Sequence, residues 1–384
     1  MYSTLKSFLD KKPLYYNEID YTRMPRIYER IKECLPKPKI IHLIGTNGKG
    51  TTGRFLATAL HNLGFSVGHY TSPHILTFNE RIWIDKKNIS DEELETAHQK
   101  LQKILNTDES NSLSYFEYTT LLSMLLFEKC HYVVMEAGLG GEHDATAVFD
   151  KILTLVTTID IDHEAFLGNS IEDIATTKLN AMQKNIILGK QKFKQVQDIA
   201  TKVATQKGTK LFIYEKLLNQ DDILKIKEIS KELLLAEYLI ENLKLAISAL
   251  KFLKLTYKVK DFQDSKLFGR LSQISKNILI DVGHNPLAAS SITKALLGKK
   301  YILIYNTYKD KDYKTILKIL KPIISHVEII DIEEERIETP EQLKNILNTL
   351  EIEYSTFIKT DKNLDYLVFG SFSVVEKFLR VHNE

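Results

Sequence analysis

The sequence is poor in the residues that mark several specialised classes of protein. Two cysteines, Cys34 and Cys130, occur in 384 residues, too few for the disulfide framework of a small secreted domain. No apolar run approaches the ~18 residues of a transmembrane helix, and the first residues lack the apolar stretch of a signal peptide. These absences predict a cytoplasmic protein without a membrane partner.

Charge of one sign is also lacking. The 52 lysine and arginine residues are nearly balanced by 50 aspartate and glutamate residues, which gives a net charge of +2. Because no large basic surface is available, we expect no nucleic-acid partner; we also expect a monomer. The 43% hydrophobic and 27% charged content is ordinary for a globular chain and excludes disorder.

Arginine is scarce among the cations, with 8 residues of the 52. Its planar guanidinium suits two-point recognition of carboxylate and phosphate, which the abundant lysine cannot provide. We therefore expect arginine where such recognition matters, and Arg54, Arg81 and Arg270 each lie beside a motif described below.

Short apolar runs alternate with stretches of helical period, a pattern typical of a parallel sheet covered by helices. The expected strands are Lys39–Ile44, Phe65–Tyr70, Tyr132–Glu136, Ile152–Ile159, Asn185–Leu188, Ile278–Val282, Tyr301–Tyr305, Val327–Ile330 and Tyr366–Phe369. Helices are expected from the capping box at Ser90 to about Leu105, over Tyr115–Phe127 and over Ala236–Leu253. The polar segment Lys258–Lys276 interrupts this pattern. We predict two α/β domains, residues 1–262 and 277–384, joined by a linker at 263–276.

A phosphate-binding loop is the strongest local signal. The apolar strand ending at Ile44 leads into Gly45-Thr46-Asn47-Gly48-Lys49-Gly50-Thr51-Thr52 and then into a helix. Backbone amides of such a turn can surround phosphate oxygens, and Lys49 can reach the β/γ-phosphates of ATP. Gly50 separates the lysine from Thr51, a departure from the commonest spacing. A glycine turn with a surface lysine is the alternative interpretation.

Polar residues at the ends of other strands suggest a magnesium site. Ser72 follows one strand, Glu136 closes another, and His163 follows a third. Carboxylate and hydroxyl oxygens suit Mg²⁺. Taken singly, Ser72 could simply lie in a turn, Glu136 could be a solvated acid, and His163 could be a structural histidine or a general base. Lys178 shares a helix face with Ile171 and Ile174. On sequence alone, however, an amine that reaches the surface is the favoured interpretation. A buried neutral amine could instead form a carbamate.

The last third of the chain contains further polar loops. Gly269-Arg270 lies in the predicted linker, Asp281-Val282-Gly283-His284-Asn285-Pro286 follows a strand, and Gly370-Ser371 ends the last strand. The Asp281–Pro286 loop carries too many functional groups to be only a turn. The charged run Lys309–Asp312 is expected to be a solvated loop.

These motifs, in this order from Asp20 to Ser371, resemble the folate branch of the Mur ligase superfamily, the folylpolyglutamate synthases and dihydrofolate synthases. The extra glycine in Gly48-Lys49-Gly50-Thr51 distinguishes that branch from the cell-wall ligases. Thr71-Ser72-Pro73-His74 with Asn79-Glu80-Arg81, and Gly138–Gly141 with Asp144-Ala145-Thr146, match it too. The resemblance implies an N-terminal domain with a P-loop ATPase-like parallel sheet and a smaller Rossmann-like C-terminal domain.

The resemblance also implies roles for individual residues. Lys49, His163 and a carbamylated Lys178 would be catalytic; ATP would be bound by Asn47, Gly48, Lys49, Gly50, Thr51, Asn242, Arg270 and Asp281; one or two Mg²⁺ ions by Ser72, Glu136 and His163; the pterin or folate by Asp20, Phe116, Glu117, His143, Asp144 and Ala145; and glutamate by His284 and Ser371. The sequence departs from the family at Leu179-Asn180-Ala181, usually Ala-Gly-Ile, and at Glu142-His143, usually Arg-Leu.

The implied activity is ATP-dependent ligation of L-glutamate to dihydropteroate or a reduced folate through an acyl phosphate. Asp20 is placed as in the bifunctional members, so we expect both acceptors to be used. Another Mur-type ligase is one alternative, and the spacing around Gly50 counts against it. A P-loop switch ATPase without ligase activity is the alternative from another class, and near-neutral charge and the Asp281–Pro286 loop count against that.

Overall fold

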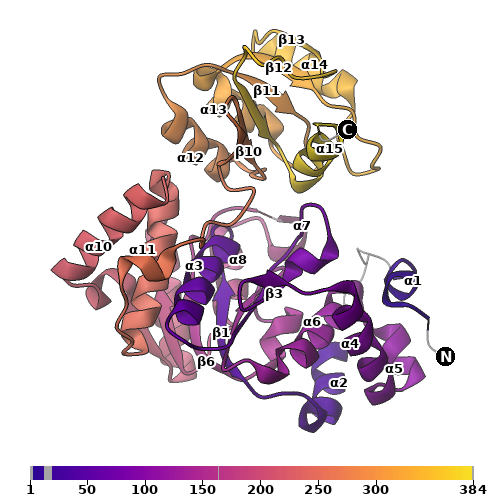
Figure 1. Ribbon diagram of the computed structural model, residues 1–384, viewed down its shortest axis with the longest axis vertical. Coiled ribbons are helices and arrows are strands. Elements are labelled where there is room, and N and C mark those ends of the chain that lie inside the picture. Colours follow the sequence, from indigo (N-terminus) through magenta and orange to yellow (C-terminus); the bar gives the residue numbers. More distant parts are fainter. Residues whose placement is uncertain (1–2, 13–19, 163, 383–384) are drawn as a thin grey trace. The chain divides into compact units, whose positions relative to one another are not determined.

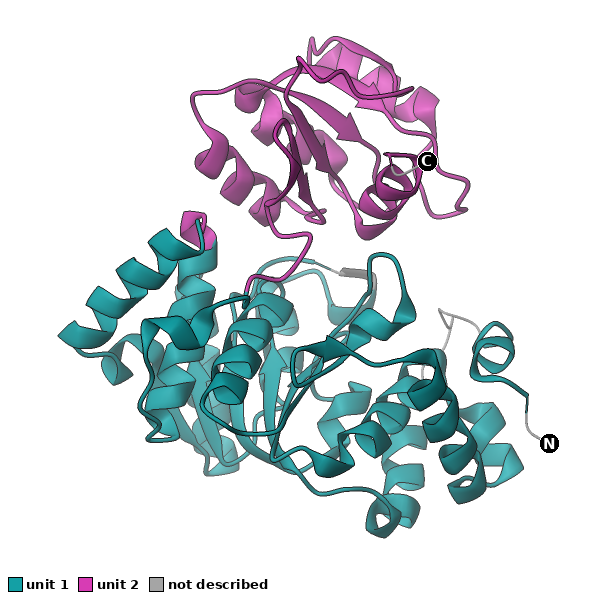
Figure 2. Ribbon diagram, in the orientation of Figure 1, with its two compact units in different colours: residues 1–234, 239–265 teal, residues 235–238, 266–384 magenta. Residues whose placement is uncertain are grey.

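The computed structural model describes residues 3–12, 20–162 and 164–382. The chain forms two compact units (Figure 2). Unit 1 consists of Met1–Leu234 and Leu239–Ser265, and unit 2 consists of Leu235–Tyr238 and Lys266–Glu384. Each unit contains its own sheet, as expected for two α/β domains.

Unit 1 is built on an eight-stranded sheet with the order β4-β3-β2-β5-β1-β6-β7-β8; Figure 1 labels β1, β3 and β6 of this sheet. The neighbouring strands β2, β5, β1, β6, β7 and β8 all pair in parallel. Strands β3 and β4 form an antiparallel edge beside β2. The strands are β1 Lys39–Ile44, β2 Val67–Tyr70, β3 Ile82–Ile84, β4 Lys87–Asn88, β5 Tyr132–Glu136, β6 Lys151–Val156, β7 Asn185–Leu188 and β8 Lys210–Ile213. Because β1 lies in the centre of the sheet, the glycine-rich loop that follows it lies in the middle of the row of carboxyl-terminal strand ends.

Helices cover both faces of this sheet. Alternation along β2 separates the faces, because Tyr70 bonds to Thr119 and Thr120 of α6, whereas His69 lies against Gly53 of α3. The helices are α1 Leu5–Leu9, α2 Arg23–Ile31, α3 Lys49–Asn62, α4 Asp91–Ile104, α5 Thr107–Ser112, α6 Tyr115–Leu126, α7 Glu164–Leu167, α8 Ile171–Leu179, α9 Lys194–Lys207, α10 Gln220–Glu232 and α11 Glu237–Phe252, with 3₁₀ turns η1 Lys32–Cys34, η2 Phe78–Arg81, η3 Phe127–Lys129, η4 Ala145–Val148, η5 Tyr214–Leu217 and η6 Val259–Phe262. Residues of α11 from Leu239 onward belong to unit 1.

Unit 2 contains a six-stranded sheet with the order β13-β12-β11-β14-β10-β9, parallel except for β9. Its strands are β9 Ser272–Ser275, β10 Ile278–Asp281, β11 Tyr301–Tyr305, β12 Ile324–Ile329, β13 Tyr354–Thr356 and β14 Tyr366–Phe369, and its helices are α12 Pro286–Leu296, α13 Tyr313–Leu320, α14 Pro340–Thr349 and α15 Phe372–His382, with η7 Lys321–Ile323. The loops that follow β10 and β14 hold the polar motifs of this unit.

All nine strands expected from the sequence are present, and the expected parallel pairing is confirmed. The sequence prediction missed the short edge strands β3, β4, β9 and β13 and the partly exposed β8. Strand β9 lies inside the segment expected as a linker, 263–276, because a polar Ser-Gln-Ile-Ser run pairs with β10 at the sheet edge. Among the helices in the described ranges, none is both long and apolar enough to cross a bilayer.

Candidate active site

The glycine-rich loop is formed as the sequence predicts, between the end of β1 and the start of α3. Gly48 adopts a left-handed conformation with φ +91°, which favours glycine. A Cβ atom added to Gly48 would lie 2.3 Å from Oδ1 of Asn242, so the loop passes directly against this side chain of α11. Asn242, which is far away in the sequence, is therefore part of the wall of the loop.

Lys49 folds back over the loop. Its Nζ donates to the carbonyl oxygens of Gly45 at 3.2 Å and Thr46 at 3.3 Å. The same ammonium lies 3.8 Å from Oε1 of Glu136. The single cation of the loop thus faces the strand-end carboxylate that the sequence places in the same crevice.

The backbone amides of the loop divide into two groups. The amides of Thr46 and Asn47 donate to the carbonyl of Thr158, which fixes the entry of the loop. The amides of residues 49–51 begin α3, where an α-helix has no preceding intrahelical acceptor. This helix end, with a glycine at the N-cap and no acid in the first turn, suits an anionic phosphate.

Ser72 and Glu136 lie together, as predicted for metal ligands. In the register of β1 and β5, Glu136 lies opposite Leu43, one residue before the end of β1. It accepts hydrogen bonds from the hydroxyl of Thr71 and, at 3.3 Å, from the backbone amide of Ser72. His163, the third predicted ligand, lies outside the described residues.

The oxygen donors at this position fit a hard divalent cation. Glu136 is 5% exposed. The hydroxyl of Ser72 lies nearby, because the backbone amide of Ser72 bonds to the Glu136 carboxylate. Within residues 3–12, 20–162 and 164–382, no group of three His, Cys, Asp or Glu residues could hold a metal by itself. The site would therefore need the serine hydroxyl, phosphate oxygens or His163 in addition to Glu136.

Lys178 is buried, with 4% of its surface exposed, and the sequence-based interpretation of an amine reaching the surface is wrong. Its Nζ donates to the carbonyl of Gly45 at 3.2 Å. Burial, together with the positive charge of Lys49, lowers the pKa of Lys178 from 10.5 to about 7. Gly141 packs against the backbone of Lys178, since a Cβ atom added to Gly141 would lie 2.4 Å from the Lys178 carbonyl oxygen.

Asp144 organises the loop after β5. One carboxylate oxygen accepts the amides of Gly138 and Leu139, each at 2.9 Å. The other oxygen accepts the amide and the hydroxyl of Thr146, and that hydroxyl also bonds to Nε2 of His42 in β1 at 2.7 Å. Burial raises the pKa of Asp144, while these hydrogen bonds lower it.

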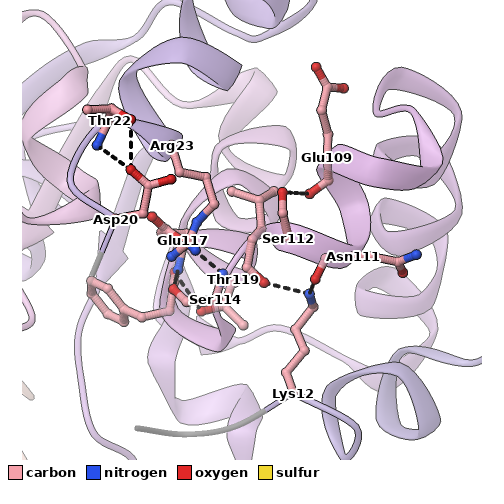
Figure 3. Close-up of polar contacts among 12 residues, drawn as sticks. Lys12, Asp20, Thr22, Arg23, Glu109, Asn111, Ser112, Ser114, Glu117 and Thr119 are labelled. Carbon is pink, nitrogen blue, oxygen red and sulfur yellow. Dashed lines mark hydrogen bonds and ion pairs between the residues drawn. The ribbon is translucent and has the colours of Figure 1, made fainter. Parts of the chain in front are cut away.

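Phe116 and Glu117, at the start of α6, face the same region. A Cβ atom on Gly138 would lie 2.6 Å from the ring of Phe116. Glu117 closes a capping box with Ser114 and forms an ion pair with Arg23, 2.8 Å from the guanidinium nitrogen (Figure 3). Arg23 therefore joins α2 to the beginning of α6.

Asp20, His143 and Ala145 complete the residues predicted to bind the pterin or folate, the acceptor of glutamate. Asp20 is exposed and accepts two hydrogen bonds from Thr22, which lower its pKa (Figure 3). The ring of His143 lies 4.4 Å from that of Tyr21, and Ala145 is buried next to Asp144. Because residues 20–23 contact both Glu117 and His143, the three predicted acceptor segments converge.

Two departures from the family pattern contact each other. Glu142 replaces the usual arginine, and Asn180 lies in the altered segment after Lys178. The amide nitrogen of Asn180 donates to Oε2 of Glu142 at 2.8 Å. The two changes thus form one local interaction on the outside of the loop.

In unit 2, Asp281 ends β10 and receives three hydrogen bonds, from the amides of Leu271 and Gly283 at 2.8 Å and from the hydroxyl of Tyr238 at 3.0 Å. Burial raises the pKa of Asp281, and the charge of Arg270 opposes that shift. The guanidinium of Arg270 lies 5.4 Å from the centre of the Phe372 ring. Arg270 and Asp281 are thus neighbours within unit 2.

His284 and Ser371 lie on adjacent loops of unit 2. The amide of Gly370 donates to the carbonyl of Gly283 at 3.1 Å, which joins the loop after β14 to the loop after β10. Ser371 is buried, and its hydroxyl accepts the amide of Val374 at 3.1 Å. The predicted glutamate residues are therefore brought together, although the hydroxyl of Ser371 already caps α15.

Several residues that contact the site were not predicted as site residues. Thr146 lies in the Asp144-Ala145-Thr146 motif but was given no role, and Arg23 lies three residues after the predicted Asp20. His42 could have been noticed as a histidine within an apolar strand, whereas Arg81 was singled out through the scarcity of arginine but was given no role. Lys311, in the run expected to be solvated, has a side chain that is 7% exposed.

The fold and the site together define the class of protein. A lysine-bearing phosphate loop at the end of a central parallel strand, faced by a strand-end carboxylate, is the ATP site of P-loop enzymes. Combined with a second, smaller α/β unit, it is the arrangement expected of an ATP-dependent ligase with a Mur ligase-like fold.

Comparisons with known proteins identify the family. The dihydrofolate synthase/folylpolyglutamate synthase of Haemophilus influenzae is 30% identical over 423 aligned positions, which cover 98% of this chain and 96% of the relative. The crystal structure of Helicobacter pylori folylpolyglutamate synthetase has a TM-score of 0.79 at 40% identity and covers 98% of this chain and 97% of that one. Escherichia coli FolC in complex with DHPP and ADP has a TM-score of 0.82 at 25% identity, covering 99% and 97%. No protein-family model matches the chain. The chain belongs to the dihydrofolate synthase/folylpolyglutamate synthase family.

Proposed function

We propose that the protein ligates L-glutamate to dihydropteroate and to reduced folates at the expense of ATP. The observation that carries the proposal is the joining of two sites within unit 1. The first site lies at the carboxyl-terminal ends of β1 and β5 and contains Lys49, Glu136 and Ser72. The second lies beside the loop that follows β5, where residues 20–23, 116–117 and 143–145 converge. The complex of E. coli FolC with DHPP and ADP, in the same fold, supports this pairing.

The proposed reaction has two steps. A carboxylate oxygen of the acceptor attacks the γ-phosphorus of ATP, and ADP leaves, which produces an acyl phosphate. The amino group of glutamate then attacks the acyl carbon, phosphate leaves, and an amide bond forms. Lys49 and the amides of residues 49–51 offset the charge on the transferred phosphoryl group.

We assign Glu136, Ser72 and His163 to the binding of Mg²⁺. The hard oxygen donors of Glu136 and Ser72, close together at the phosphate loop, support this assignment. When bound, the ion would neutralise phosphate charge. Lys49, 3.8 Å from the carboxylate, would hold the phosphates on the other side.

Lys178 is proposed to act as a carbamate. Its neutral amine would attack CO₂, form an N–C bond and release a proton, leaving an anion in place of a cation. The buried position and the pKa of about 7 keep the amine reactive, and the nearby charge of Lys49 disfavours an ammonium but stabilises an anion. This charge arrangement supports the proposal.

We further propose that residues 1–262 bind ATP and the acceptor, and that residues 277–384 provide glutamate binding. Asn47, Gly50, Thr51, Asn242, Arg270 and Asp281 would contact the nucleotide, and His284 and Ser371 would contact glutamate. Free Cys34 and Cys130 support a cytoplasmic enzyme, and the balanced charge supports the lack of a nucleic-acid partner. We keep the expectation of a monomer.

Release of ADP by the purified protein tests the function. We expect release to require both L-glutamate and an acceptor, with dihydropteroate and tetrahydrofolate each serving, and labelled glutamate to appear in both products. ATP hydrolysis that ignores glutamate would instead indicate a P-loop switch ATPase. Incorporation into tetrahydrofolate alone would restrict the proposal to a monofunctional folylpolyglutamate synthase.

A further inference from the structure

Arg81, at the end of η2, is a buried cation with an unusual set of neighbours. Only 9% of its surface is exposed. Its Nε donates to Nδ1 of His74 at 2.8 Å. The guanidinium carbon lies 5.8 Å from the ring centre of Phe78 and 5.6 Å from that of Tyr115. One hydrogen bond and two aromatic rings therefore fix the plane of the guanidinium.

None of these neighbours neutralises the charge. Among the residues that the structure describes, no carboxylate lies within ion-pair distance of Arg81. The adjacent Glu80 is engaged elsewhere, because its two oxygens accept the backbone amides of residues 75–77. A charge that is largely removed from water and unpaired is unfavourable, so an anion that binds to the two Nη nitrogens would relieve this cost.

The backbone places Arg81 next to the nucleotide end of the site. The amide of Thr71 donates to the carbonyl of Arg81 at 2.9 Å. Thr71 is the residue whose hydroxyl bonds to Glu136. Arg81 is therefore one hydrogen-bonded pair away from the carboxylate that faces Lys49.

The side chain of Arg81 extends toward the acceptor end. Tyr115, which stacks with it, directly precedes Phe116, whose ring lies against Gly138. Burial raises the pKa of Tyr70 to about 12, and this shift is opposed by the charge of Arg81 and reinforced by that of Asp144. The charges of Arg81 and Asp144 therefore both act on the hydroxyl of Tyr70.

We propose that the Nη edge of Arg81 binds a carboxylate of the acceptor. The inference rests on the proposed function and specifies which residue recognises the anionic end of its substrate. A guanidinium held by Nε and by two rings leaves a planar pair of donors, the arrangement that matches a carboxylate. Two carboxylates qualify: the reacting group, which every acceptor has, and the additional carboxylate that a folate carries on its glutamyl residue.

Arg54 provides a matched control. Its Nε donates to Nδ1 of His69 at 3.3 Å, and its guanidinium lies 4.8 Å from the ring centre of Trp83. Like Arg81, it thus combines a histidine with an aromatic ring. It differs in place, because His69 and Trp83 point to the α3 face of the sheet, opposite to Tyr70 and α6.

The test compares Arg81→Lys and Arg81→Gln with Arg54→Lys and Arg54→Gln. Steady-state ADP release gives KM for each acceptor and for ATP, and calorimetric titration with dihydropteroate and tetrahydrofolate gives binding without turnover. We expect both Arg81 variants to weaken acceptor binding, by about 10- to 100-fold for glutamine and less for lysine, with KM for ATP nearly unchanged. The Arg54 variants should retain the acceptor KM of the wild type.

The two acceptors distinguish the two carboxylates. Weakening for both dihydropteroate and tetrahydrofolate would assign the reacting carboxylate, and weakening for tetrahydrofolate alone would assign the glutamyl one. Folded Arg81 variants that bind both acceptors like the wild type, or Arg54 variants that weaken binding equally, would overturn the inference. A wild-type protein that binds acceptors but releases no glutamate-dependent ADP would overturn the proposed function instead, and titration would still test Arg81.

Discussion

The nucleotide end of the site is made mostly of contiguous residues, whereas the acceptor end is assembled from distant ones. Residues 45–52 supply the backbone of the phosphate loop, with Lys49 bonded to carbonyls three and four positions away. At the acceptor end, the contacts Arg23–Glu117 and His42–Thr146 join residues 94 and 104 positions apart. The nucleotide end therefore depends on local backbone geometry, and the acceptor end depends on the packing of α2, α6 and the loop after β5.

Loss of Lys49 should have the largest effect. Lys49→Ala removes the single cation of the phosphate loop, so turnover should fall by about 10²-fold or more, as expected when a preorganised charge is lost. Steady-state ADP release measures this, and thermal melting checks folding. The exposed Lys194→Ala on α9 serves as a control with unchanged turnover. Turnover near that of the wild type would contradict an essential charge at the nucleotide end.

Lys178 tests whether an anion is needed between the two ends. We expect Lys178→Ala to be inactive in the absence of additives, because the proposed carbamate cannot form, and to be partly rescued by short carboxylates such as acetate or formate. ADP release with and without these anions is the measurement. An active Lys178→Ala enzyme, or wild-type crystals with a free amine at full occupancy, would argue against the carbamate.

Stability against pH checks the burial of Lys178 independently of activity. The folded pKa of about 7 is below the unfolded value of 10.5, so the unfolded state binds more protons between these values. Stability of the wild type relative to Lys178→Met should therefore rise with pH above about 7, by at most ~1.4 kcal/mol per pH unit. Denaturant unfolding in CO₂-free buffer at pH 6 to 9 measures the difference. A pH-independent difference would mean that the amine is solvated.

Thr146 tests the assembly of the acceptor end. Thr146→Val removes the hydroxyl that links Asp144 to His42, which should cost about 1–3 kcal/mol of stability and lower acceptor kcat/KM roughly tenfold, with little change in KM for ATP. Thr146→Ser should restore both. Thr154→Val is the control, because the buried Thr154 hydroxyl has no partner among the described residues. Equal changes in KM for ATP and acceptor would show that the two ends are not independent.

Asp20 should give the smallest effect. It is exposed, and one of its oxygens is already occupied by Thr22, so Asp20→Ala should lower kcat/KM with dihydropteroate by only about two- to five-fold. Tetrahydrofolate should be affected less. Parallel assays with the two acceptors measure the ratio. An equal loss with both would assign Asp20 to the shape of the α2 entry rather than to recognition of the pterin.

The same division explains what could be predicted from the sequence. The positions of the parallel strands along the chain, the phosphate loop and the position of Glu136 follow from apolar runs and motifs within a few residues. The edge strands β3, β4 and β9 were missed because they are short or polar and depend on pairing. The burial of Lys178 could not be predicted, since its amine bonds to the carbonyl of Gly45, 133 positions earlier.

The contact between Gly48 and Asn242 has a consequence for folding during protein synthesis. The nascent chain contains the entire phosphate-loop motif by residue 52, but the side chain that packs against this loop is made about 190 residues later. At the speed of a ribosome this delay is roughly 10 to 40 s. During that interval the loop lacks its native wall, so ATP can assist folding of unit 1 only after α11 has emerged.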